Sequence, residues 1–171
     1  MKKHTKKLVI SSLFAALTLV ATLFLAIPLP TGYANLGDCV GFLAGFVLGG
    51  FGVAAAGVGS ALADLIGGYG IYAIATFIIK AFVALCGFMA ARLSKNKRAQ
   101  ILIIAAFSLL AEAVMVLGYF FFESVFLGVG TAALASVVGN LTQAVVGIVT
   151  STLLALIFTK NQKLSSLVSD L

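Results

Sequence analysis

Residues 8–27 read LVISSLFAALTLVATLFLAI and contain no charged side chain. A helix of about 20 apolar residues is long enough to cross the hydrocarbon core of a bilayer. The run follows a lysine-rich start, as in a signal peptide, but it is longer than the apolar part of a signal peptide and shows no clear small-x-small cleavage motif. We therefore predict a retained membrane helix, which stops at Pro28 and Pro30 because proline breaks helices.

The whole chain has the same apolar character. Of its 171 residues, 62% are hydrophobic and 9% are charged, whereas a soluble domain carries about 25% charged residues. Such a chain cannot supply a polar surface, so its solvent must be lipid. No linker or change of composition divides the sequence, and we expect a single domain over residues 1–171.

Ten of the 11 Lys and Arg residues lie in three short polar segments, at residues 2–7, 92–98 and 160–163. A net charge of +6 is compatible with nucleic-acid binding in a soluble protein. Short basic segments beside apolar helices, however, are typical of cytoplasmic loops of membrane proteins. We therefore expect lipid, and no nucleic acid, around this chain.

Further apolar segments follow the first one. Residues 38–66 are rich in glycine, and the cluster GGFG at 49–52 predicts a turn between two short helices, because glycine breaks helices and allows tight reversals. The other predicted spans are residues 72–93, 100–121 and 131–159. Loops are predicted at residues 31–37, 67–70, 94–99 and 123–130.

The basic segments decide between five and six spans. One unbroken helix over residues 38–66 would leave one or two basic segments outside the cell, whereas two helices place all three on the same side. The positive-inside rule favours the second arrangement. The predicted fold is an all-α membrane protein with six transmembrane helices and both termini in the cytoplasm.

Five charged residues outside the three basic segments fall within the predicted spans or at their ends: Asp38, Asp64, Lys80, Glu112 and Glu123. A charge at the centre of a membrane helix costs about 2.5–3.5 kcal/mol on insertion scales, so it is usually paired, neutralised or functional. Lys80 and Glu112 either face a central pocket or form an ion pair that only fixes helix packing. Asp38 either takes part in a site or caps the second helix, and Glu123 lies near solvent.

Asn140 and Gln143 lie three residues apart and therefore on one helix face. Their amides donate and accept hydrogen bonds, which suits a heteroaromatic ring with hydroxyl groups, although such side chains also bond helices to one another. Tyr119 and residues 120–122 either stack on a ligand or belong to an interfacial aromatic belt.

The sequence lacks motifs for ATP binding, for a histidine-based site and for a cysteine pair. The sequence has no G-x-x-x-x-G-K-[ST] motif for ATP. Its one histidine, His4, lies in the basic start, and Cys39 and Cys86 fit two separate apolar core positions rather than a disulfide or metal pair. We predict that the chain is no enzyme and binds neither a cofactor nor a metal.

Several segments, taken in order, resemble the S components of energy-coupling-factor (ECF) vitamin transporters, which are the substrate-binding membrane subunits of these importers. The segments are IPLPTGYANLGD at 27–38, GSALADL at 59–65, GGY at 67–69, TFIIK at 76–80, EAVMVLGYF at 112–120 and GNLTQ at 139–143. The resemblance covers nearly the whole chain, and the branch it resembles most contains the riboflavin, pyridoxine and hydroxymethylpyrimidine types.

The resemblance implies a six-helix subunit in the cell membrane of a bacterium. Such a subunit captures a small water-soluble vitamin or precursor from outside and joins a transmembrane coupling subunit and two cytoplasmic ATPases, which use the ATP. The family's ligand site implies binding roles for Asn35, Asp64, Lys80, Glu112, Tyr119, Asn140 and Gln143.

The resemblance also implies a partner contact on the first helix. Family members carry an Ala-x-x-x-Ala strip there that touches the coupling subunit. This chain has Ser-x-x-x-Ala twice, which assigns the contact to Ser11, Ser12, Ala15 and Ala16. Small residues four apart let another helix approach closely.

A different class of function competes with this interpretation. A stand-alone secondary transporter or a small channel would have a similar composition. Two observations argue against this class. The sequence shows no evident inverted repeat, and 171 residues is short for a transporter that works by alternating access. Co-purification with ATPases and a coupling subunit separates the two classes.

Overall fold

The structure is a computed structural model that describes residues 3–29 and 32–161. The two chain ends, for which we predict a cytoplasmic location, and Pro30 lie outside the described residues. Six α-helices dominate the described part: α1 (Lys3–Phe24), α2 (Gly37–Leu48), α3 (Gly50–Ile66), α4 (Ala73–Leu93), α5 (Gln100–Phe121) and α6 (Leu134–Lys160). The predicted all-α class is confirmed.

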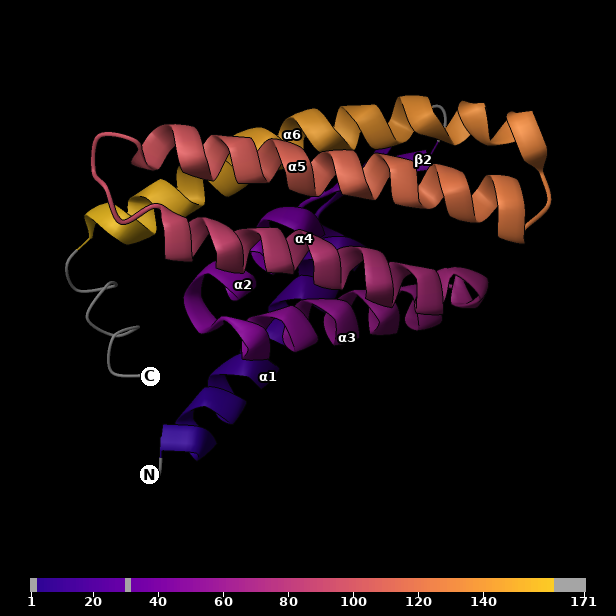
Figure 1. The fold of residues 1–171 in the computed structure, drawn as a ribbon. Coiled ribbons are helices and arrows are strands. Elements are labelled where there is room, and N and C mark those ends of the chain that lie inside the picture. Colours follow the sequence, from indigo (N-terminus) through magenta and orange to yellow (C-terminus); the bar gives the residue numbers. More distant parts are fainter. Residues whose placement is uncertain (1–2, 30–31, 162–171) are drawn as a thin grey trace.

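The helices pack as a bundle around α4 (Figure 1). α4 contacts α2 and α3 on one side and α5 on the other, and α6 packs against α5 and α2. α1 packs against α2 and α3, and its N-terminal part extends away from the bundle. Phe42, Val83, Ile104 and Met115 are fully buried where α2, α4 and α5 meet.

The segment after α1 differs from our expectation of a loop. It forms two antiparallel strands, β1 (Ala26–Leu29) and β2 (Gly32–Asn35), with Ala26 opposite Asn35. Proline favours extended backbone for itself and the residue before it, and this conformation suits a strand at a sheet edge. The hairpin brings β2 against α6.

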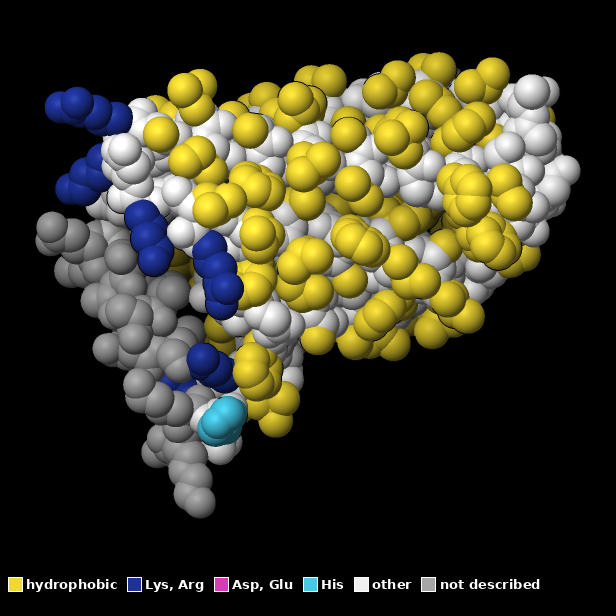
Figure 2. All heavy atoms as spheres, in the orientation of Figure 1, with side chains coloured by type: hydrophobic (Ala, Val, Ile, Leu, Met, Phe, Trp, Pro, Cys, Tyr) yellow, Lys and Arg dark blue, Asp and Glu magenta, His cyan; other side chains and the backbone are white. Residues whose placement is uncertain are grey.

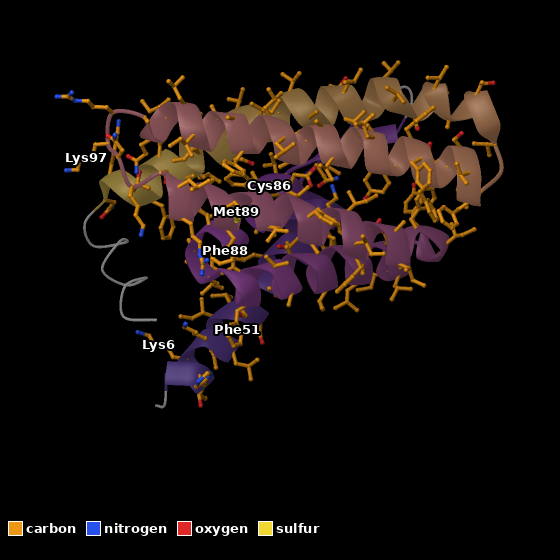
Figure 3. The ribbon with its side chains drawn as sticks, viewed as in Figure 1. Lys6, Phe51, Cys86, Phe88, Met89 and Lys97 are labelled. Carbon is orange, nitrogen blue, oxygen red and sulfur yellow. The ribbon has the colours of Figure 1, made fainter. Side chains whose placement is uncertain are left out.

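The predicted turn between α2 and α3 is confirmed. Gly49 ends α2 and precedes α3 with a φ of 61°, a conformation that glycine adopts easily. Just before it, α2 crosses α4 so closely that a Cβ on Gly45 would collide with the backbone of Ala84. Phe88 of α4, labelled in Figure 3, lies over this turn, with its ring 3.1 Å from the position of a Cβ on Gly49.

Length separates the helices into two groups. Four segments are long and apolar enough to cross a membrane by length and composition: His4–Phe24, Gly70–Leu93, Gln100–Phe126 and Gly130–Lys160. α2 has 12 residues and α3 has 17, which at 1.5 Å per residue gives about 18 and 26 Å against a hydrocarbon core of about 30 Å. These two helices are apolar but short.

The predicted loop at residues 123–130 is largely helical. A π-helical turn, η2 (Phe122–Phe126), continues α5, and a 3-10 turn, η3 (Gly130–Ala133), leads into α6. A third short turn, η1 (Gly70–Tyr72), precedes α4. The other predicted spans agree with α4 and α5 to within a residue or two.

The outside of the bundle is apolar along its length. Large side chains such as Ile74 and Leu102 are 78% and 73% exposed, as expected for surfaces that contact lipid. Figure 2 shows hydrophobic side chains over most of the bundle and Lys and Arg side chains gathered at one end. Lys6 and Lys97 lie at this basic end (Figure 3).

Candidate functional site

A cavity of about 170 Å³ lies in the half of the bundle farther from the basic end. It lies between the end of α1, β2, η1 with the first half of α4, the end of α5 with η2, and the start of α6. Its lining consists of Thr22, Asn35, Tyr69, Tyr72, Lys80, Tyr119, Glu123, Ser136, Gly139, Asn140 and Gln143.

A network of four buried side chains lies on one side of this cavity, and we call it the floor network: Asn35, Lys80 and Gln143, which line the cavity, and Asp38, which bonds to two of them. Lys80 Nζ donates to Asp38 Oδ1 at 2.5 Å, and Gln143 Nε2 donates to Asp38 Oδ2 at 2.5 Å. Asn35 Nδ2 donates to Gln143 Oε1 at 3.0 Å. The network ties β2, α2, α4 and α6 together.

The other side of the cavity, which we call the rim, contains Tyr72, Glu123 and Ser136. Tyr72 donates its hydroxyl proton to Glu123 Oε1 at 3.4 Å, and Ser136 donates to Glu123 Oε2. Tyr72 ends η1 and precedes Lys80 of α4 by eight residues, which corresponds to about 12 Å along a helix. The rim is therefore nearer the end of the bundle than the floor network.

Tyr119 lies between the rim and the floor network. Its hydroxyl is 3.0 Å from Thr76 Oγ1, and Lys80 Nζ is 5.5 Å from the centroid of its ring. The rings of Tyr72 and Tyr119 are 6.5 Å apart between centroids. A ligand in this cavity would meet aromatic rings as well as amide, hydroxyl and carboxylate groups.

The structure brings most of the predicted site residues together. Asn35, Lys80, Tyr119, Asn140 and Gln143 all line the cavity. Asn140 and Gln143 share one face of α6, as their spacing predicts. Gln143 bonds to Asn35 and Asp38, so it also performs the helix-bonding role that we considered as its alternative.

Asp64 and Glu112 were expected in the same site, but they do not line the cavity. Asp64 is buried on α3, which packs against α1, α2 and α4 rather than α6. Glu112 is buried deeper on α5, against Gly147 of α6, where a Cβ would collide with its carboxylate. Asp64 Oδ2 and Glu112 Oε2 are buried without a hydrogen-bond partner among the described residues.

Two alternatives from the sequence prove wrong. Lys80 forms its ion pair with Asp38 and not with Glu112. Asp38 does not cap α2, since Leu36 is the N-cap residue and the Asp38 carboxylate bonds to Lys80 and Gln143 instead. Both results depend on which helix faces Lys80, and periodicity along one helix does not contain that information.

Sequence reasoning missed Tyr72, Ser136 and Gly139 and gave Glu123 no role beyond solvent. The spacing on α6 contained a signal for two of them. Ser136, Gly139, Asn140 and Gln143 follow the pattern i, i+3, i+4, i+7 and share one helix face. For Asp38, the signal was charge balance, because Lys80 needed one of the carboxylates in the spans as a partner.

The strip on α1 is divided between two faces. Ser11 is buried, and the carbonyl of Ala15 lies against Gly59 of α3, so that pair faces the inside of the protein. Ser12 and Ala16 are exposed on the other side. Small residues at Gly59 and Ala15 explain the close approach of α1 and α3.

The described residues contain no group of three or more His, Cys, Asp and Glu side chains that could hold a metal ion. Cys39 and Cys86 are buried and free. The site therefore offers hydrogen bonds, aromatic rings and two charged positions for binding a small molecule.

Comparison with known proteins places this fold and site in context. Residues 2–160 match the family model described as ECF-type riboflavin transporter, S component. The chain is also 39% identical over 136 residues to an uncharacterized protein in gap 3'region from Pyrococcus woesei, and the match covers 76% of this chain and 86% of that protein.

Proposed function

Because the chain belongs to the S-component family of ECF-type transporters, which makes it a substrate-binding subunit of a vitamin transporter, we propose that its cavity binds a single-ring vitamin or precursor. The pyridoxine and hydroxymethylpyrimidine types are the first candidates and riboflavin is the next. Delivery into the cell proceeds through a transmembrane coupling subunit and two cytoplasmic ATPases, since members of this family work with such partners.

The observation that carries this proposal is the convergence of polar side chains from distant segments on one cavity. Asn35, Lys80, Tyr119, Asn140 and Gln143 come from β2, α4, α5 and α6 and meet there. Ligand sites typically combine apolar walls with a few placed polar groups. The cavity of about 170 Å³ is small beside the roughly 300–1,000 Å³ of pockets for drug-sized ligands, which favours one ring over the three rings of a flavin.

The proposed orientation follows from the distribution of charge. The basic end faces the cytoplasm by the positive-inside rule, so the cavity belongs to the outer half of the membrane. In this arrangement all six helices cross or enter the bilayer, with α2 and α3 reaching less far than the others, and both termini are cytoplasmic. Residues 1–171 act as one domain, in the cell membrane.

The partner contact on α1 belongs to the same proposal. The exposed pair Ser12 and Ala16 provides a smooth strip for a helix of the coupling subunit. Ser11 and Ala15 support this strip from behind, through the contact of Ala15 with Gly59. The chain itself has no ATP motif, so the energy comes from the partners.

Two measurements on the full chain test the proposal. Purification from a membrane that also contains the coupling subunit and ATPases should recover all of them together. Mass spectrometry of small molecules retained through purification in mild detergent should identify the vitamin. Uptake by this chain alone, without ATPases, would instead support the stand-alone secondary transporter or channel.

A further inference from the structure

We propose that the ligand carries a positively charged nitrogen and that Glu123 is its counter-charge at the rim of the cavity. This inference rests on the proposed function, because it concerns the same cavity. It goes further by naming the charge of the ligand and the residue that selects for it.

The charges of the floor network already balance. Lys80 and Asp38 form an ion pair at 2.5 Å, and their side chains are 6% and 0% exposed. The second oxygen of Asp38 accepts from Gln143. An anionic ligand group would have to compete with Asp38 for Lys80, and separating a buried pair is costly. The floor network therefore suits neutral polar groups.

Glu123 is the other charged residue in the lining, and its partners are neutral. The hydroxyl groups of Tyr72 and Ser136 bond to its two oxygens. No ion pair of Glu123 is found among the described residues. With Lys80 neutralised by Asp38, the cavity has one negative charge that no cation among residues 3–29 and 32–161 balances.

Aromatic rings lie beside this carboxylate. Tyr72 bonds to it directly, and its ring is 6.5 Å from that of Tyr119 and 5.5 Å from that of Phe122, between centroids. Tyr69 also lines the cavity. A carboxylate next to several aromatic rings recognises cationic nitrogen through charge and through the negative faces of the rings.

Glu123 also joins η2 to η1 and α6 through the hydroxyl groups of Tyr72 and Ser136, so a packing role competes with the ligand role. The two roles differ in what a neutral replacement does. If Glu123 only holds the helices together, Glu123→Gln lowers thermal stability and leaves ligand preference unchanged. If it is a counter-charge, the replacement lowers affinity for cationic ligands selectively.

The experiment measures binding by titration calorimetry on the purified full chain in mild detergent. The probes are thiamine, which has a permanently charged ring nitrogen, pyridoxine, whose ring nitrogen can be protonated, and riboflavin, which is uncharged. The variants are Glu123→Gln, which removes the charge, and Glu123→Asp, which keeps it. Ser136→Ala keeps the carboxylate and removes one neutral partner.

We expect pyridoxine, the single-ring probe, to bind and Glu123→Gln to weaken that binding by about 10- to 100-fold, the range for a hydrogen bond to a charged group. Glu123→Asp and Ser136→Ala should retain the preference for the cationic probes over riboflavin. Binding of riboflavin alone, binding of no probe, or equal affinities of the native protein and Glu123→Gln would overturn the inference.

Different results would contradict the role of Glu123 and the proposed transporter function. A retained ligand without a basic or quaternary nitrogen, in a protein that still co-purifies with the coupling subunit and ATPases, overturns the role of Glu123 alone. Absence of these partners overturns the transporter assignment, whatever the charge of the bound probe.

Discussion

At the scale of single residues, Asp38 is the centre of the floor network. It accepts bonds from Lys80 on α4 and from Gln143 on α6, and it is 1% exposed. A buried charge without its partner is much less stable than the intact pair. The stability of this half of the bundle therefore depends on Asp38 and Lys80 being present together.

Replacing Asp38 by asparagine should destabilise the protein by about 3–5 kcal/mol, because it leaves the ammonium group of Lys80 buried without a counter-charge. Thermal unfolding of the purified protein in detergent measures this. The double variant Asp38→Asn/Lys80→Met removes both charges and should recover most of the loss. If the double variant is less stable than Asp38→Asn, the charge explanation is wrong.

Asn140 and Gln143 should behave differently from each other, although both line the cavity. Gln143→Ala removes the hydrogen bonds that Asn35 and Asp38 form with the Gln143 side chain, so stability should fall by about 1–3 kcal/mol. The Asn140 side chain forms no hydrogen bond within the described residues, so Asn140→Ala should weaken ligand binding about 5- to 150-fold and leave stability unchanged. Calorimetry with the retained vitamin and thermal unfolding, on the same two variants, give both quantities.

The sequence predicted part of this site and not the rest, for a physical reason. Helical spacing places Asn140 and Gln143 on one face, and the cost of buried charge singles out Lys80 and Glu112. Which residue faces Lys80 depends on the rotation and depth of separate helices. No pattern within one segment reports these, so the cap stayed an alternative for Asp38, and Glu112 was expected in a cavity that it does not line.

At the scale of elements, the helices and turns with strong local sequence patterns were predicted accurately, and those with weak patterns were missed. Long apolar runs between polar loops predicted the first and last residues of α4 and α5 to within a residue or two. The glycine cluster that contains Gly49 predicted the turn between α2 and α3. The β1–β2 hairpin was missed because prolines and glycines around it signal irregular chain, and its stability comes from pairing and from contact with α6. The helical turns after α5 were missed because Gly128 and Gly130 indicate an irregular chain there.

The close crossing of α2 and α4 depends on glycine. A Cβ on Gly45 would collide with the backbone of Ala84, which has no flexible end to move away. Gly45→Ala should therefore destabilise the protein by about 1–3 kcal/mol, the usual cost of overpacking. Gly50→Ala is the matched control, since nothing lies within 4 Å of its Cβ position. Equal thermal unfolding of the two variants would contradict the close crossing.

On α1, a bulky substitution should have different effects in the two pairs of small residues, Ser11 with Ala15 and Ser12 with Ala16. Ala16 is exposed, so Ala16→Trp should abolish uptake by the complete transporter while the isolated protein still binds its vitamin. The backbone at Ala15 packs on Gly59, so Ala15→Trp should lower stability as well. Val145→Trp, at a position that is 64% exposed on α6, serves as the control that should leave uptake unchanged. Normal uptake by Ala16→Trp would reject the partner contact.

At the scale of the whole molecule, two features fix how the protein lies in the membrane. Apolar side chains cover the length of the bundle, and the Lys and Arg side chains visible in Figure 2 gather at one end. The cavity lies in the opposite half, between the starts of α4 and α6 and the end of α5. If the basic end is cytoplasmic, the cavity faces the compartment from which an importer takes its substrate.

Cysteine labelling tests this orientation directly. In a background with Cys39 and Cys86 replaced by alanine, one variant carries Lys97→Cys at the basic end and the other carries Val129→Cys, at a position that is 47% exposed after η2. The positive-inside rule places residue 97 in the cytoplasm and residue 129 outside. A membrane-impermeant maleimide should therefore label Val129→Cys in intact cells and Lys97→Cys only after the cells are permeabilised. The reverse pattern would place the cavity on the cytoplasmic side, where it could not capture a vitamin from outside, and labelling of both positions in intact cells would rule out the six-helix orientation.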